Sequence, residues 1–131
     1  MLSEVDIKDL VYRYLVSANL DDTVSGGIYK DARPMNSMLE DVEITVLTSS
    51  IAQNQTFIVN VNVFVPDVIR GDEYIEDTPR LRTLSSAFMT KLLDFNEIGY
   101  FIQCESQRIY KVNDTDFHVI NNRINIKFNS E

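Results

Sequence analysis

Apolar residues occupy every second position, from Phe57 to Val65, in the stretch of the chain that begins at Gln55 and ends at Asp67. A period of two with β-branched residues predicts a half-buried strand that packs on one side only. Asn60 and Asn62 fall on the opposite, polar face. Pro66 closes the strand, because proline has no N–H to donate to a sheet. The apolar positions are Phe57, Val59, Val61, Val63 and Val65.

Two other stretches follow the period of an amphipathic helix. Ser3 is the expected cap of the first helix, which ends near Asn19. The apolar positions of this helix are Ile7, Leu10, Val11, Tyr14, Leu15 and Ala18. Thr78 is the expected capping hydroxyl of the second helix, with Pro79 at its first helical position and Glu97-Ile98-Gly99 at its end. Its apolar stripe is Leu81, Leu84, Phe88, Leu92 and Phe95.

Three further long strands are predicted at residues 42–51, 100–112 and 116–128, with a short strand at 28–30. Gln53-Asn54 and Asn113-Asp114 are the expected hairpin turns. In the last strand the apolar parity changes between Val119 and Ile124. One extra residue near Asn121-Asn122 reconciles the two halves, so we predict a β-bulge there. Residues 20–41 and 67–77 are predicted to be loops.

The order of these elements predicts the fold class. A helix, a short strand, a hairpin, a second helix and a second hairpin are typical of an α+β domain. We expect a mostly antiparallel sheet of about four long strands with two helices packed on one face, in a single domain spanning residues 1–131.

The composition and net charge of the chain exclude some classes of binding partner. The formal net charge is −8, with 20 acidic against 12 basic residues. This balance argues against binding nucleic acid by phosphate neutralisation and against anionic membranes. The single cysteine excludes an internal disulfide. We find neither a signal-peptide pattern nor a membrane-spanning apolar run, and therefore expect cytoplasmic synthesis.

The sequence offers few candidates for chemistry. His118 is the only histidine, and Cys104 is the only thiol that it could activate. Strands that pair around the 113–114 turn could bring the two together, although a structural histidine and an inert buried thiol are the favoured interpretation. Arg108, Arg123 and Lys127 could form a basic strip or be scattered surface charge.

Acidic side chains also have two interpretations. Asp72-Glu73 with Glu76-Asp77, and Asp114 with Asp116, could bind a hard cation through carboxylate oxygens. They lack the regular spacing of a calcium loop, and solvated loops are favoured. We therefore predict no catalytic residue, no cofactor, no metal ligand and no enzymatic activity.

The full arrangement resembles the tail-completion or tail-terminator family of long-tailed bacteriophages, in versions from phages and prophages of Bacteroides-like bacteria. The similarity covers nearly the whole chain and rests on strand patterns and turn residues. Many members have a proline and an aromatic residue where this chain has Glu40-Asp41. The similar stretches are Ile7–Leu15, Gly27-Ile28-Tyr29-Lys30, Arg33–Ser37, Glu40–Ile44, Val59–Val63 with Pro66-Asp67, and His118–Ile126.

The resemblance implies a structural role in virion assembly. Such proteins assemble into a ring, commonly a hexamer, which caps the tail tube and offers a surface to the head–tail connector. We expect contacts with the tail-tube protein and the connector, no membrane partner, and DNA only passing through the lumen. An acidic lumen suits that passage because like charges repel. The location is then the host cytoplasm during assembly and the virion tail afterwards.

Two kinds of subunit contact and three other functions stay open. The loops at 20–41 and 67–77, or the sheet edges at Val42–Ile51 and Tyr100–Val112, could join subunits. The alternatives are another virion protein such as a head–tail adaptor, an acidic inhibitor of a host protein that mimics DNA charge, and an enzyme built around Cys104 and His118.

Overall fold

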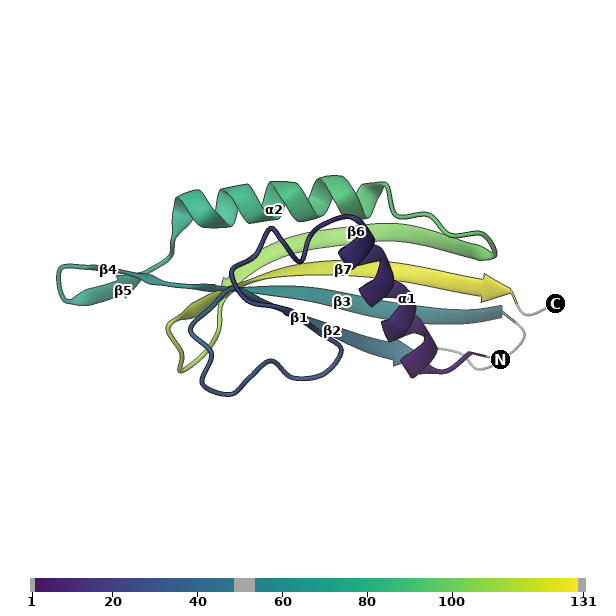
Figure 1. Cartoon of the computed structure of the whole chain (residues 1–131), viewed down its shortest axis with the longest axis horizontal. Coiled ribbons are helices and arrows are strands. Elements are labelled where there is room, and N and C mark those ends of the chain that lie inside the picture. Colours follow the sequence, from purple (N-terminus) through teal and green to yellow (C-terminus); the bar gives the residue numbers. More distant parts are fainter. Residues whose placement is uncertain (1, 49–53, 130–131) are drawn as a thin grey trace.

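A computed structural model of the chain describes residues 2–48 and 54–129. The described residues form two helices, a five-stranded sheet and a separate two-stranded hairpin (Figure 1). The predicted α+β class is confirmed. The elements in chain order are α1 Glu4–Ser17, β1 Ile28–Tyr29, β2 Asp41–Thr48, β3 Asn54–Pro66, β4 Val68–Arg70, β5 Glu73–Ile75, α2 Thr78–Leu93, β6 Tyr100–Lys111 and β7 Phe117–Asn129.

The large sheet has the strand order β1-β2-β3-β7-β6, so the two longest strands lie at its centre. β3 pairs with β7 continuously over their full 13 residues, from Asn54 opposite Asn129 to Pro66 opposite Phe117. All the long strands pair antiparallel, as predicted. The short β1 is parallel to β2.

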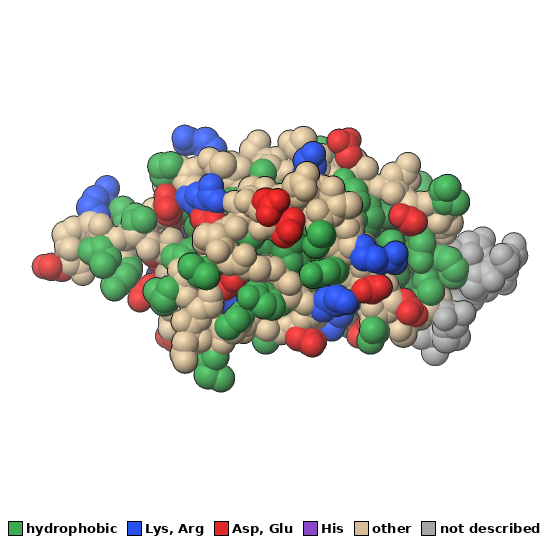
Figure 2. Space-filling view, in the orientation of Figure 1, with side chains coloured by type: hydrophobic (Ala, Val, Ile, Leu, Met, Phe, Trp, Pro, Cys, Tyr) green, Lys and Arg blue, Asp and Glu red, His purple; other side chains and the backbone are tan. Residues whose placement is uncertain are grey.

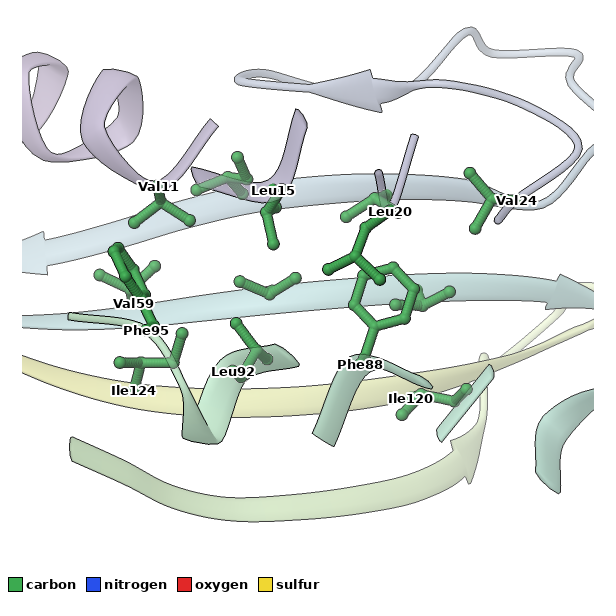
Figure 3. Close-up of a cluster of buried hydrophobic side chains, with 14 of the residues drawn as sticks. Val11, Leu15, Leu20, Val24, Val59, Phe88, Leu92, Phe95, Ile120 and Ile124 are labelled. Carbon is green, nitrogen blue, oxygen red and sulfur yellow. The ribbon is translucent and has the colours of Figure 1, made fainter. Parts of the chain in front are cut away.

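One hydrophobic core lies between the sheet and both helices. The alternating apolar residues of β3 are all buried in it, which confirms the predicted face of that strand. Figure 3 shows how side chains of α1 and α2 meet those of β3 and β7. Both helices therefore cover the same face, and the opposite face of the sheet is called the open face below. The helix residues buried in the core are Ile7, Leu10, Val11, Leu15, Leu81, Leu84, Phe88 and Leu92.

The first helix forms as predicted. The Ser3 side chain accepts a hydrogen bond from the backbone N–H of Asp6, and the Asp6 carboxylate accepts one from the N–H of Ser3, which completes a capping box. Near the other end, the ring of Tyr14 stacks on Phe95 with 4.2 Å between centroids. The hydroxyl of Tyr14 donates to the carbonyl of Lys91. Tyr14 thus joins the two helices across the core.

The second helix differs from the prediction at both ends. Its cap is Asp77, whose carboxylate accepts from the backbone N–H of Arg80, and Thr78 is already helical. The helix ends at Leu93, before the predicted Glu97-Ile98-Gly99 stop. Phe95 remains buried beyond the end of the helix, so its place in the apolar stripe is correct although its conformation is not helical.

The predicted loop at 67–77 is wrong, because most of it forms a β-hairpin. β4 and β5 pair around Gly71, which has a φ of +63° that favours glycine. The hairpin projects from one end of the molecule and lies clear of the sheet (Figure 1). We call residues Val68–Ile75 the arm.

The predicted bulge at Asn121-Asn122 is also wrong. Phe117 and Val119 face the open side of the sheet, so the register of β7 needs no extra residue. Phe117 is nevertheless buried, because the guanidinium of Arg33 covers its ring at 4.2 Å. A bulge occurs instead in β6, where Glu105 is the extra residue between Cys104 and Ser106.

The predicted turn at Gln53-Asn54 and the end of the predicted strand 42–51 lie partly outside the described residues. The hairpin that they join is confirmed by the pairing of β2 with β3. Within the described chain, neither helix combines the length and the apolar character needed to cross a membrane.

The core predicts a clear response to truncation. Phe88 is fully buried at the centre of α2, so Phe88→Ala leaves a cavity and should lower the free energy of unfolding by about 3–5 kcal/mol. Ser86→Ala, at an exposed position on the same helix, should change it by about 0.5 kcal/mol or less. Urea denaturation measures both, and equal losses for the two variants would contradict this description of the core.

Candidate functional site

The only thiol and the only histidine of the chain lie far apart. Cys104 is opposite Ile124, whereas His118 is opposite Lys111 near the other end of β7. Six residues of strand separate the two positions, which corresponds to about 20 Å. Cys104 is half-buried against the core, and burial raises the pKa of its thiol. The structure therefore does not form the Cys104–His118 pair considered from the sequence.

The acidic candidates for a cation site are dispersed. Asp72 and Glu73 lie at the tip of the arm, Asp77 caps α2, and Asp114 occupies the β6–β7 turn with a φ of 60°. In residues 2–48 and 54–129, no three carboxylate, imidazole or thiol side chains are grouped as metal ligands.

The segment between α1 and β2 is held by buried charge. Asp41, at the start of β2, has a side chain only 1% exposed. It accepts hydrogen bonds from the guanidinium of Arg33 at 3.0 Å, the hydroxyl of Ser37 at 2.5 Å and the backbone N–H of Gly27 at 3.1 Å. A carboxylate with three donors offsets the cost of its burial. These bonds fix the loop over the open face, where Arg33 also stacks on Phe64.

The neighbouring Glu40 connects the same segment to the second helix. Its two carboxylate oxygens accept from Nε of Arg80 at 2.5 Å and from a terminal nitrogen of Arg80 at 2.8 Å. Arg80 also donates to the carbonyl of Thr23 at 2.6 Å, and Glu40 accepts from the N–H of Ser25. The hydrogen bonds with Glu40 are the main cause that raises the pKa of Arg80, so the ion pair keeps its charge.

The sequence analysis did not identify this network. Part of it was predictable from Arg80, because a basic residue in the first turn of a helix is unfavourable with the helix dipole unless an acidic partner is near. The partner could not be found from spacing, since Glu40 is 40 residues away along the chain.

Gly26 lies where the segment touches these two carboxylates. A Cβ on Gly26 would be 2.0 Å from Oδ1 of Asp41 and 2.5 Å from the carbonyl oxygen of Glu40. Only glycine fits this close approach of loop and strand. The predicted loop at 20–41 is therefore a fixed structure around the short strand β1.

The arm is anchored at its base by Asp67, the residue between β3 and β4. Its carboxylate is fully buried and accepts from Nζ of Lys111 at 2.8 Å, and its other oxygen lies 2.7 Å from Nδ1 of His118. The backbone N–H of Asp67 donates to the carbonyl of Asp116. Burial alone raises the pKa of Asp67, but the hydrogen bonds from Lys111 and His118 outweigh it and hold the pKa below the usual value. His118 thus forms part of the base of the arm.

Beyond this base the arm exposes apolar side chains. Ile69 and Tyr74 are opposite each other in the β4–β5 register, so they share one face of the hairpin. Ile69 is 65% exposed and Tyr74 is 50% exposed. In the space-filling view the arm extends from the body as a projection that carries hydrophobic and charged side chains (Figure 2). A two-stranded hairpin is marginally stable alone, so its exposed apolar face is a candidate contact surface.

Both edges of the large sheet carry strand backbone without a strand partner in the described part of the chain. β6 is outermost on one side, and β1 covers only the start of β2 on the other. β6 carries the bulge at Glu105 and exposed Arg108 and Lys111, which are features that discourage edge pairing. The arm is therefore a stronger candidate for a contact with another protein than either sheet edge.

The open face of the sheet is mainly polar. Asn121, on β7, donates from its side chain to the side-chain oxygens of Asn60 and Asn62 on β3. The basic residues predicted as a strip, Arg108, Arg123 and Lys127, do share this face by their register positions. Arg123 forms an ion pair with Glu105 at 3.4 Å, so the strip is interrupted by an acid.

Comparison with known proteins adds no assignment. The sequence matches no family model and no curated protein.

The tight approach at Gly26 predicts that this segment resists substitution. Gly26→Ala should lower the free energy of unfolding by about 1–3 kcal/mol, because the new methyl group displaces Asp41 or the backbone of Glu40. Asn36→Ala, an exposed position in the same loop, should leave it nearly unchanged. Chemical denaturation compares the two variants, and a neutral Gly26→Ala would contradict the close packing.

The charge at the base of the arm predicts a pH dependence. Because the pKa of Asp67 is lowered in the folded protein, its stabilisation is complete above the ordinary value of 3.8 and is lost as the pH falls through the native pKa. Asp67→Asn should therefore cost about 1–3 kcal/mol at neutral pH, and the difference from wild type should shrink below pH 3.8. Asp116→Asn, an exposed neighbour, is the control. A pH-independent difference would exclude the ionised carboxylate as its source.

Proposed function

We propose that the protein is a structural component of a bacteriophage tail, which associates with copies of itself into a ring, caps the tail tube and presents a joining surface to the head. The observation that carries the proposal is the arm. It projects from the body of the molecule (Figure 1), and its Ile69 and Tyr74 side chains are exposed. An apolar projection of this kind serves a protein that binds another protein.

The rest of the molecule supports an assembly role. A fold anchored by the buried carboxylates of Asp41, Glu40 and Asp67 holds the arm and the 20–41 segment in fixed relative positions. Fixed contact surfaces lower the entropy lost when subunits associate. The similarity of the sequence to tail terminators, which includes Gly27–Lys30 and Arg33–Ser37, covers residues of this same anchored segment.

Self-association is tested by light scattering against concentration, with negative-stain images of any large species. The proposal predicts masses that are multiples of 15.1 kDa and closed rings of commonly six subunits. A protein that stays at 15.1 kDa at every concentration contradicts ring formation and favours the acidic inhibitor.

A second experiment separates a tail terminator from a head–tail adaptor, which could also form rings. Rings added to a polymerising tail-tube protein from a long-tailed Bacteroides phage should shorten the tubes and appear at one end of each. Tubes of unchanged length without bound rings would favour the adaptor.

The arm should control association without affecting folding. Ile69→Asp with Tyr74→Asp places two charges on the apolar face of the hairpin and should weaken self-association by roughly tenfold or more. The matched control is Val5→Asp with Ile98→Asp, which adds the same charge at two exposed apolar positions elsewhere. Sedimentation measures the association, and urea denaturation confirms that each variant is folded. Equal weakening by both pairs would show that net charge, and not the arm, is responsible.

A further inference from the structure

A groove lies between the second helix and the loop that follows the first helix. Its volume is about 640 Å³, and small or apolar side chains line it, among them Ala18, Leu20 and Ala87. Arg82 and Lys91, nine residues apart on α2, lie toward its two ends. No carboxylate of the described chain is among its lining residues, and neither Arg82 nor Lys91 has an ion-pair partner there.

The arm has the complementary chemistry. Residues 68–76, the arm with the residue after it, contain three acids and one base, the acids being Asp72, Glu73 and Glu76. Its apolar face carries the large side chains of Ile69 and Tyr74. The small side chains that line the groove leave room for them. An acidic projection with an apolar face thus matches a groove with a basic rim and small side chains.

The lengths also agree. Three to four strand residues from Val68 to the turn extend about 10–13 Å. Nine residues of helix from Arg82 to Lys91 rise about 13–14 Å. The arm can therefore lie along the groove with its tip near one of the two bases.

The arm of a subunit does not reach the groove of the same subunit. It points away from α2, although only two residues lie between the end of β5 and the start of α2 (Figure 1). Its base is fixed on one side by Asp67 and on the other by Asp77, the cap of α2. An arm bound in this groove would therefore belong to another copy of the chain.

We propose that the arm of each subunit binds in the α2 groove of the next subunit, with Asp72 and Glu73 near Arg82 or Lys91. Two different surfaces meet in such a contact, and repetition of a heterologous contact closes a ring when the rotation allows it. The inference rests on the proposed self-association and names the surfaces that produce it. It also assigns Asp72 and Glu73 to a subunit contact.

Cysteine cross-linking tests the contact directly. In a Cys104→Ala background, which removes the native thiol, Ile69→Cys is placed on the arm of one preparation and Ser86→Cys in the groove of another. A mixture of the two should give disulfide-linked dimers under mild oxidation, and each preparation alone should not. Thr45→Cys, exposed on the open face, replaces Ser86→Cys as the control.

A charge exchange provides an independent measurement. Arg82→Glu with Lys91→Glu should weaken association by roughly tenfold, and adding Asp72→Lys with Glu73→Lys should restore it. Arg108→Glu with Lys127→Glu makes the same change in net charge on the open face and should not be rescued by the arm substitutions.

The outcomes separate this inference from the proposed function. Oligomers that form without the mixed cross-link and without charge rescue overturn the arm–groove contact and leave ring assembly intact. Cross-links between two arms, in the Ile69→Cys preparation alone, would instead show a symmetric contact and also overturn the inference. A wild-type protein that never associates contradicts the proposed self-association and the contact with it.

Discussion

The continuous pairing of β3 with β7 is the constraint on which the rest of the structure depends. Their thirteen-residue register sets which side chains of both strands face the helices, because a slip of one residue would turn the apolar set outward. The helices then cover one face only, and the other face is mainly polar, with asparagine, arginine and threonine side chains beside apolar ones such as Phe64 and Phe117. The pairing also ends at Pro66, so it determines the point at which the chain leaves the sheet to form the arm.

Buried carboxylates convert this sheet into a rigid support for its projecting parts. Glu40 and Asp41, adjacent in sequence, take separate partners, Arg80 on α2 and Arg33 in the loop. Asp67 does the same at the end of β3 with Lys111 and His118. Each of these acids would be costly to bury alone, and each has charged donors within hydrogen-bond distance. The result is an arm with a fixed base and a free tip, which is a suitable geometry for joining subunits.

The sequence predicted the parts of the fold that follow from local pattern. The period of β3, the cap at Ser3 and the apolar stripe of α2 are local signals, and the structure confirms them. The arm was missed because its strands have three residues each, too few to show a period. The bulge was misplaced because Phe117 was assumed to face the core, whereas it lies on the open face and is covered by Arg33. A contact with a distant loop cannot be predicted from the local pattern.

The candidate site was less predictable than the fold. Glu40 and Arg80 are 40 residues apart, and Asp67 and His118 are 51 apart, so their pairing depends on the tertiary structure. The distance between Cys104 and His118 likewise depends on the register of β6 with β7, which the sequence did not provide. The glycine at position 26 indicated a turn, and the basic Arg80 in the first turn of a helix indicated an acidic partner. Neither residue identified Glu40 or Asp41 as its neighbour in the structure.

The central claim is that the arm is a surface that binds another subunit. Amide hydrogen exchange of the arm, measured at several protein concentrations, tests it most directly. In dilute protein the amides of residues 68–75 should exchange quickly, while those of β3 and β7 are protected. At high concentration the arm amides should become protected together with the residues of its binding surface. Arm amides that are protected equally at all concentrations, in a species of 15.1 kDa, would contradict the account.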